Sequence, residues 1–145
     1  ARHKHCLAED GAALAVSSMS AVHPRIKHLQ SVAEEGGREA HFDDNVPVRR
    51  GFMSANSLLL QGKTAQAESD IERAYVLKWR FTIFFIERLS AHKDFGQASL
   101  KADRMRLKAA CKDVLEELAT ELKPILEKRY GAEEAANAAA LAAQQ

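Results

Sequence analysis

The stretch 64–92 is the part of this sequence that most restricts how the chain can fold. Five of the nine aromatic residues of the 145-residue chain lie in it: Tyr75, Trp79, Phe81, Phe84 and Phe85. On a helical wheel its apolar side chains cover nearly the whole circumference, and only Arg73, Arg80 and Glu87 form a polar stripe. A helix that is apolar on almost all sides has to be enclosed by other helices. The sequence therefore predicts a buried helical rod over 71–89.

Apolar residues at alternating spacings of three and four predict a second helix before this rod. The seam comprises Ala8, Ala12, Ala15, Met19, Val22, Ile26, Leu29 and Ala33. Pro24 interrupts the hydrogen bonding but leaves the register intact, so we expect one kinked helix, or two collinear ones, rather than a reversal. Gly36 and Gly37 are expected to end this helix.

The segment between the two helices is predicted to hold a loop followed by a shorter helix. Residues 38–51 are charged and contain Pro47, which is typical of a connection. A helix then starts near Pro47 or at Ser54, where serine is a good N-cap. Gly62 is expected to break or kink this helix, with Thr64 capping a fresh start.

The last long helix is predicted to open at Gln97 or Ser99, after a turn at 94–96. Its apolar seam contains Leu100, Leu107, Cys111, Val114, Leu118, Leu122 and Ile125. The seam crosses Pro124 in register, which favours a kink over an end. Gly131 is expected to terminate the helix as the residue after its C-cap.

These elements predict an all-α fold, an antiparallel helical bundle of three long helices that are kinked or split into four to five segments. We expect three regions: an N-terminal arm over 1–7, the bundle over 8–131, and an alanine-rich C-terminal tail over 132–145.

Composition narrows the classes of function. The formal net charge is +1, so no overall field attracts the chain to nucleic acid, and nucleic acid is an unfavoured partner. The longest uncharged stretch, 11–22, is shorter than the ~20 residues that a membrane span needs. The first residue is alanine, which fits either removal of a targeting segment, for example an organellar one, or numbering of part of a longer chain. The sequence leaves the compartment open.

The catalytic motifs that we sought do not occur. The sequence contains no Glu-x-x-His pair, no His-Glu-x-x-His run and no Gly-x-Ser-x-Gly elbow. Cys111 lies on an apolar seam, where cysteine is usually an inert core residue. We therefore expect a protein that is not an enzyme and that uses no cofactor.

One set of residues could hold a metal ion. His3, His5 and Cys6 offer two imidazoles and a thiolate within four residues, which suits zinc, copper or nickel. A solvated terminal arm is the simpler interpretation of the same residues.

A basic stripe on the last helix is the candidate binding surface for a partner. Lys101, Arg104, Lys108 and Lys112 are spaced by three, four and four residues, and acidic residues follow from Asp113 onward. This order opposes the helix dipole, so it contributes little to the stability of the helix. A surface of this kind could meet an acidic helix, a phosphate backbone or only solvent.

The favoured function is a non-enzymatic helical interaction protein, an accessory or adaptor subunit that binds a protein partner or a second copy of itself. Two alternatives remain. The first is a bundle that binds a metal or a small ligand between helices, in a pocket lined by Tyr75, Trp79, Phe84 and Met105. The second is nucleic-acid binding through the basic stripe.

Overall fold

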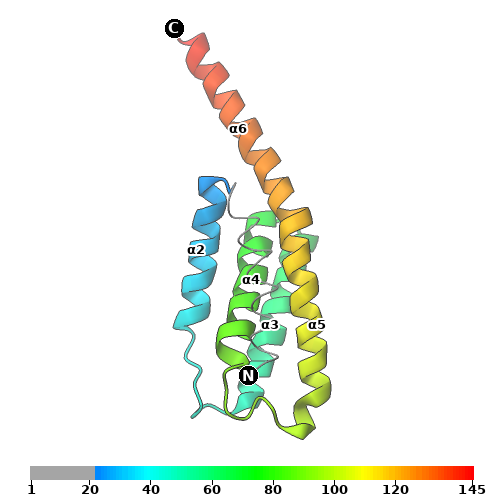
Figure 1. Cartoon of the computed structure of the whole chain (residues 1–145). Coiled ribbons are helices and arrows are strands. Elements are labelled where there is room, and N and C mark those ends of the chain that lie inside the picture. Colours follow the sequence, from blue (N-terminus) through cyan, green and yellow to red (C-terminus); the bar gives the residue numbers. More distant parts are fainter. Residues whose placement is uncertain (1–21) are drawn as a thin grey trace.

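The computed structural model describes residues 22–145, and every regular element in that range is a helix. The all-α prediction is confirmed. The helices are α2 (Pro24–Glu39), α3 (Val48–Ala67), α4 (Ile71–Ile83) with a π-helical turn (Phe84–Leu89), a 3-10 turn (Ala98–Leu100), and α5 (Lys101–Glu117) joined by a π-helical turn (Leu118–Leu122) to α6 (Lys123–Ala143). Figure 1 shows α2, α3 and α5 arranged around α4, while α6 continues far past the ends of the other helices.

The central rod lies where the sequence placed it. The side chain of Asp70 accepts a hydrogen bond from the backbone N–H of Arg73 and so caps α4 at its first turn. Most of the side chains on α4 and its π-helical turn are buried, including Tyr75, Phe81 and Phe85. Packing on several sides thus holds a helix that water could not solvate favourably.

The described part of the chain forms four helical rods, not the three that the sequence predicted. The difference comes from a turn between α3 and α4, where Ser69 has a φ of 63°. The predicted break at Gly62 is wrong, because α3 passes through this residue without interruption. A Cβ at Gly62 would come within 2.8 Å of Cγ of Lys78, so the glycine serves close packing against α4.

The first described helix begins at Pro24, where the sequence predicted a kink or the junction of two collinear helices. His23 has an extended backbone conformation and its side chain accepts a hydrogen bond from the N–H of Arg25, so α2 starts at Pro24 rather than running through it. Proline suits this position because its missing N–H would have no helical partner. The apolar seam before residue 22 lies outside the described residues.

The predicted end at Gly36 and Gly37 is also wrong, since α2 continues to Glu39. A Cβ on Gly36 would lie 2.5 Å from Nε of Arg80, so the absent side chain makes room for this arginine. Arg80 donates to the carbonyls of Val32 and Ala33 at 3.3 and 3.4 Å. The two glycines therefore bring α2 and α4 together.

The C-terminal end of α2 is tied to the end of the rod. Arg88 donates to the carbonyl oxygens of Arg38, Ala40 and Phe42 at 3.1, 3.0 and 2.6 Å. A cation there satisfies carbonyls that have no helical partner and complements the negative end of the helix dipole.

The last rod is continuous through Pro124, as predicted, and the π-helical turn comes just before it. Its buried seam contains Leu107, Cys111, Val114, Leu118, Leu122, Leu126 and Tyr130. The predicted end at Gly131 is wrong, because α6 continues to Ala143 with every residue from Gly131 onward exposed. No described helix combines the length and the apolarity that crossing a bilayer would require.

Candidate association surfaces

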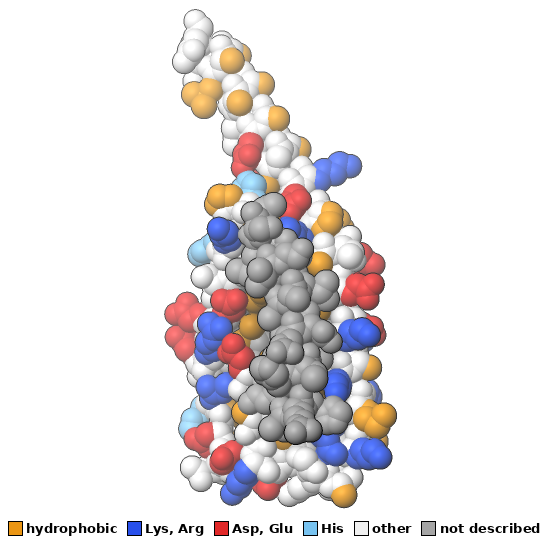
Figure 2. Space-filling view, in the orientation of Figure 1, with side chains coloured by type: hydrophobic (Ala, Val, Ile, Leu, Met, Phe, Trp, Pro, Cys, Tyr) orange, Lys and Arg blue, Asp and Glu red, His pale blue; other side chains and the backbone are white. Residues whose placement is uncertain are grey.

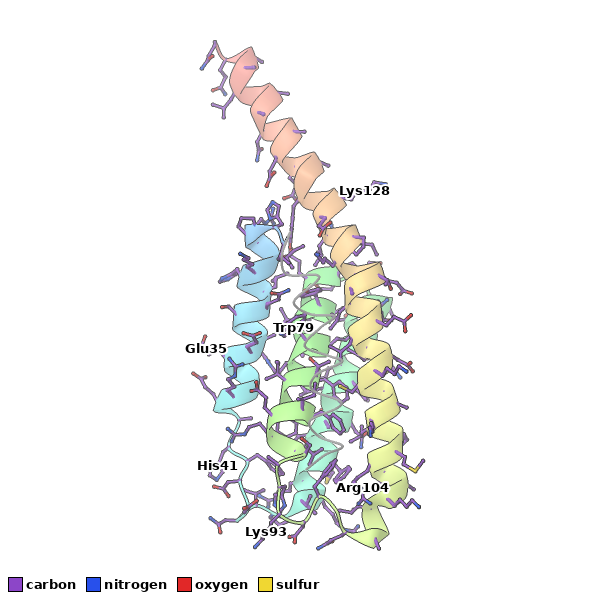
Figure 3. All side chains as sticks on the ribbon, viewed as in Figure 1. Glu35, His41, Trp79, Lys93, Arg104 and Lys128 are labelled. Atoms are coloured by element: carbon purple, nitrogen blue, oxygen red, sulfur yellow. The ribbon has the colours of Figure 1, made fainter. Side chains whose placement is uncertain are left out.

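The outer face of α5 carries three of the four residues that the sequence singled out. Lys101, Lys108 and Lys112 are exposed. Arg104 is half-buried and points toward the base of the bundle, where its Nη1 donates to the carbonyl oxygens of Phe95, at 2.8 Å, and Gln97 (Figure 3). The structure therefore gives Arg104 a role in closing the turn before α5, and it leaves a stripe of three lysines.

Large apolar side chains are exposed on α5 and on the neighbouring helix α3. Met105 lies within the stripe with 62% of its surface exposed, and Met53 and Leu60 on α3 are 69% and 67% exposed. Arg106 ties the two helices together by donating to Oδ1 of Asn56 at 3.0 Å. We use the name α3–α5 face for the exposed residues Met53 and Leu60 of α3 together with Met105 and the three lysines of α5. Large apolar side chains that are exposed to solvent are typical of an interaction surface where they lie close together.

Acidic residues follow the lysines along this rod. Asp113 and Glu116 at the end of α5 and Glu121 in the π-helical turn are exposed. In Figure 2, blue side chains follow the lower right edge of the molecule and red ones lie above them on the same edge. The exposed surface of this rod is therefore basic up to Lys112 and acidic from Asp113 to Glu121.

Glu117 turns inward. It forms an ion pair with Lys78, which is only 3% exposed, and Lys78 also donates to Oε1 of Gln66. This cluster joins α3, α4 and α5 at one point. The sequence analysis missed it, although Lys78 falls within the apolar part of the α4 wheel and could have been marked as a buried lysine.

A second polar cluster fastens α6 to the start of α2. Arg25 pairs with Glu133 at 2.5 Å and places its guanidinium 3.8 Å from the centre of the Tyr130 ring, while His23 contacts Glu134. Burial raises the pKa of Tyr130 to about 12, and the nearby Glu72 adds to the shift. These contacts are the last that α6 makes with the other described helices.

The sequence also named a metal site and a ligand pocket as candidates. His3, His5 and Cys6 lie outside the described residues, and the described part holds no group of three potential metal ligands. The proposed ligand pocket does not exist as predicted, since Trp79 lies in the core and Met105 points to solvent.

Cys111 is fully buried, and burial raises the pKa of its thiol to about 12. The thiol is therefore protonated at neutral pH and does not have the thiolate that a nucleophilic cysteine needs.

Fold and surface together define a helical association domain. The chain belongs to the family described as the USP8 dimerisation domain, which matches residues 20–133. The interaction role and the expectation of a protein partner or a second copy are therefore confirmed.

Relatives with similar sequences come from distant organisms. A protein of Xenopus laevis named "STAM-binding protein-like" is 31% identical over 65% of this chain, and one of Dictyostelium discoideum named "Probable ubiquitin thioesterase DG1039" is 34% identical over 72%. An "AMSH-like ubiquitin thioesterase 1" of Arabidopsis thaliana is 30% identical over 63%. The matches cover only 22%, 13% and 18% of the lengths of these relatives.

The names of the last two relatives contradict the expectation that the protein is not an enzyme, because both contain the words "ubiquitin thioesterase". The sequence could not reveal this. The expectation rested on motifs sought in a chain that corresponds to a small part of those proteins.

Proposed function

We propose that this chain is the self-association module of a ubiquitin thioesterase, and that two copies pair through their α3–α5 faces. The family description and the names of the relatives support the class of protein. The main observation for the surface is the order of charges along α5 and the π-helical turn after it, basic up to Lys112 and acidic from Asp113 to Glu121. On this proposal the module is the bundle within 8–131, flanked by the arm over 1–7 and the tail over 132–145.

The charge order of α5 is self-complementary. A two-fold axis across the helix sets two copies of α5 antiparallel, because such an interface uses the same patch on both subunits. Lys108 of one copy then faces the acidic residues of the other copy, where Glu116 is exposed. A parallel arrangement would instead oppose like charges, so the order of charges selects the antiparallel pair.

The apolar side chains would form the buried centre of this interface. Interfaces are stabilised mainly by a central group of buried apolar residues, with charged residues at the rim. Met53, Leu60 and Met105 would form this centre, and Lys101 and Lys108 would lie at its edge. Methionine adapts its shape to irregular surfaces, which suits a surface that packs against a copy of itself.

Charge reversal with rescue tests this arrangement. Lys108→Glu and Glu116→Lys should each weaken the dimer by about tenfold, since each places like charges opposite one another. The double variant restores opposite charges and should recover most of the loss. Sedimentation equilibrium across a range of concentrations measures the dimer dissociation constant for each form.

The matched control is Lys27→Glu, which makes the same charge change on an exposed position of α2. It should leave the dissociation constant unchanged. If neither single reversal weakens the dimer, the α5 surface is not the dimer interface, although the chain still associates with itself. If the wild-type chain stays monomeric at all concentrations, it does not self-associate and the proposed function is wrong.

A further inference from the structure

The turn between α3 and α4 ends α3 in a motif that usually contains glycine. The N–H of Ser69 donates to the carbonyl oxygen of Gln66 at 3.0 Å, and the N–H of Asp70 donates to the carbonyl oxygen of Ala65 at 2.9 Å. These two hydrogen bonds define a Schellman motif, in which the residue after the C-cap adopts the left-handed conformation and is most often glycine. Here that residue is Ser69, with a φ of 63°. A side chain in this conformation costs stability that glycine would not cost.

The side chain of Ser69 makes no contact that would offset this cost. It is exposed, and its hydroxyl forms no hydrogen bond to any other described residue. A residue that is held in an unfavourable backbone conformation without a structural contact points to a use for its side chain outside the fold. An exposed serine hydroxyl is a chemical acceptor for a phosphoryl group.

Acidic residues surround Ser69 at the spacing that acidophilic protein kinases recognise. Asp70 and Glu72 follow it by one and three positions, and Glu68 precedes it. A kinase of this class selects its substrates by pairing basic side chains of its cleft with carboxylates at such positions. Among the serines and threonines of the sequence, only Ser31 and Ser69 have an acidic residue three positions later, and of these two only Ser69 also has one directly after it.

The structure separates these two serines. Ser31 lies within α2, where helical hydrogen bonds fix the backbone on both sides of it. Ser69 lies in a turn whose residues 67–70 are all exposed. A kinase binds its substrate segment in an extended conformation, and opening a turn between two helices breaks fewer hydrogen bonds than opening the middle of a helix. Ser69 is therefore the more accessible acceptor.

We propose that Ser69 is a phosphorylation site for an acidophilic serine/threonine kinase. Oγ of Ser69 forms a bond to the γ-phosphorus of ATP, the bond from this phosphorus to the oxygen that bridges it to the β-phosphate breaks, and ADP leaves. The hydroxyl proton passes to the catalytic base of the kinase. The transfer adds a charge of about −2 to the turn at neutral pH. This modification does not depend on the pairing of two copies through the α3–α5 face.

The fold has positive groups beside the position of the phosphate. Asp70 caps α4, so a phosphate on the preceding residue lies near the positive end of the α4 dipole. Arg73 is exposed in the first turn of α4 and adds a guanidinium. Both offset the repulsion from the carboxylates of Glu68 and Asp70. We therefore expect the phosphorylated chain to stay helical, with a Tm within about 5 °C of that of the unmodified chain.

Phosphorylation of the purified chain tests the proposal. The chain is incubated with ATP and an acidophilic casein kinase, and the modified residue is located by mass spectrometry of proteolytic fragments. We expect a phosphate on Ser69 and none on Ser31. Circular dichroism of the same sample, recorded before and after the reaction, shows whether the chain that was modified is folded.

Two variants test the role of the carboxylates. Asp70→Asn keeps a residue that caps helices well, and Glu72→Gln keeps the length of the side chain, so both chains should fold. Each loses one charge that the kinase recognises, and each should lower the kcat/KM for phosphorylation of Ser69 by about tenfold. The matched control is Glu35→Gln, the same change at an exposed position of α2, which should leave this kcat/KM unchanged.

Ser69→Gly tests the conformational cost. Glycine favours the left-handed position, so this variant should have a higher Tm than the wild type and should accept no phosphate in the turn. A variant with a lower Tm would show that the serine side chain supports the turn, and the reason to seek a use for it outside the fold would be removed.

Three further results would overturn the proposal. Absence of phosphate from Ser69 in the folded chain would show that the kinase does not reach the turn. Equal phosphorylation of Ser31 and Ser69 would show that the turn does not select the acceptor. A kcat/KM that neither Asp70→Asn nor Glu72→Gln lowers would show that the acidic residues do not direct the kinase.

Discussion

Two regions of this molecule hold helices in place by different means. Around Lys78, three helices meet: Gly62 of α3 lies against the stem of this lysine, Gln66 accepts from its ammonium, and Glu117 of α5 pairs with it. We call this group the Lys78 cluster. Beyond Gly131, by contrast, α6 extends away from the bundle and none of its residues is buried (Figure 1).

The difference shows where helix stability comes from. The end of α6 is rich in alanine, which has the highest intrinsic helix propensity and loses little entropy on folding. The helices of the Lys78 cluster contain glycine and aromatic residues, which are poor helix formers, and tertiary packing compensates for them. A substitution of the same kind should therefore change the stability of the protein differently in the two regions.

The largest difference is expected for ion pairs. Glu117→Gln keeps the shape of the side chain but leaves the buried Lys78 ammonium without its carboxylate. Breaking a buried pair costs several kcal/mol, and the partial exposure of Glu117 reduces this to about 2 kcal/mol. Urea denaturation at neutral pH measures the loss. Glu133→Gln removes the carboxylate that pairs with the exposed Arg25 and should cause no measurable change.

Equal losses in these two variants would show that the Lys78 cluster is hydrated in solution. The two regions would then not differ in the strength of their ion pairs, since both pairs would behave as surface pairs.

The sequence predicted the helical class and the buried rod because the pattern of apolar residues carries both. It failed at Gly36, Gly37 and Gly62, where glycine was taken as a helix end. Each of these residues lies within a helix and against a side chain of α4, namely Arg80, Ile83 or Lys78. Sequence alone does not separate a glycine that ends a helix from one that admits a neighbour, because the neighbour is distant in the chain.

The candidate surface was predicted in part. Lys101, Lys108 and Lys112 could be placed on one side of α5 from their spacing alone. The inward turn of Arg104 could not, because its acceptors are carbonyl groups of the preceding loop. The apolar part of the α3–α5 face was also missed, since whether Met53 and Leu60 are exposed depends on which side of α3 meets α4.

Glycine substitutions give the next largest contrast. Gly62→Ala gains helix propensity but brings a methyl group within 2.8 Å of the buried stem of Lys78, so we expect a net loss of about 1 kcal/mol. Gly131→Ala has open space around the new methyl group and should gain up to about 1 kcal/mol. Thermal unfolding followed by circular dichroism should show shifts of opposite sign. A gain in both variants would mean that Lys78 moves aside at little cost.

The smallest effect is a pH dependence that belongs to the buried seam of α5. Burial raises the pKa of the Cys111 thiol from 9.0 to about 12, so the folded protein holds this proton more tightly than the unfolded chain does. The resulting contribution to stability is full below pH 9 and is lost as the pH rises from about 9 toward 12. By pH 9.5 we expect the loss to be just under about 1 kcal/mol.

Urea denaturation of the wild type and of Cys111→Ala at pH 7 and pH 9.5 isolates this contribution. The variant is less stable than the wild type at both pH values, because the substitution leaves a small cavity. This loss cancels when the stability of each protein at pH 9.5 is compared with that of the same protein at pH 7. Tyr75 and Tyr130 titrate in both proteins, so their contribution cancels as well. The wild type should therefore lose more stability than the variant between the two pH values. Parallel losses would indicate that water reaches the thiol, which would weaken the contrast between a tightly packed seam and the exposed end of α6.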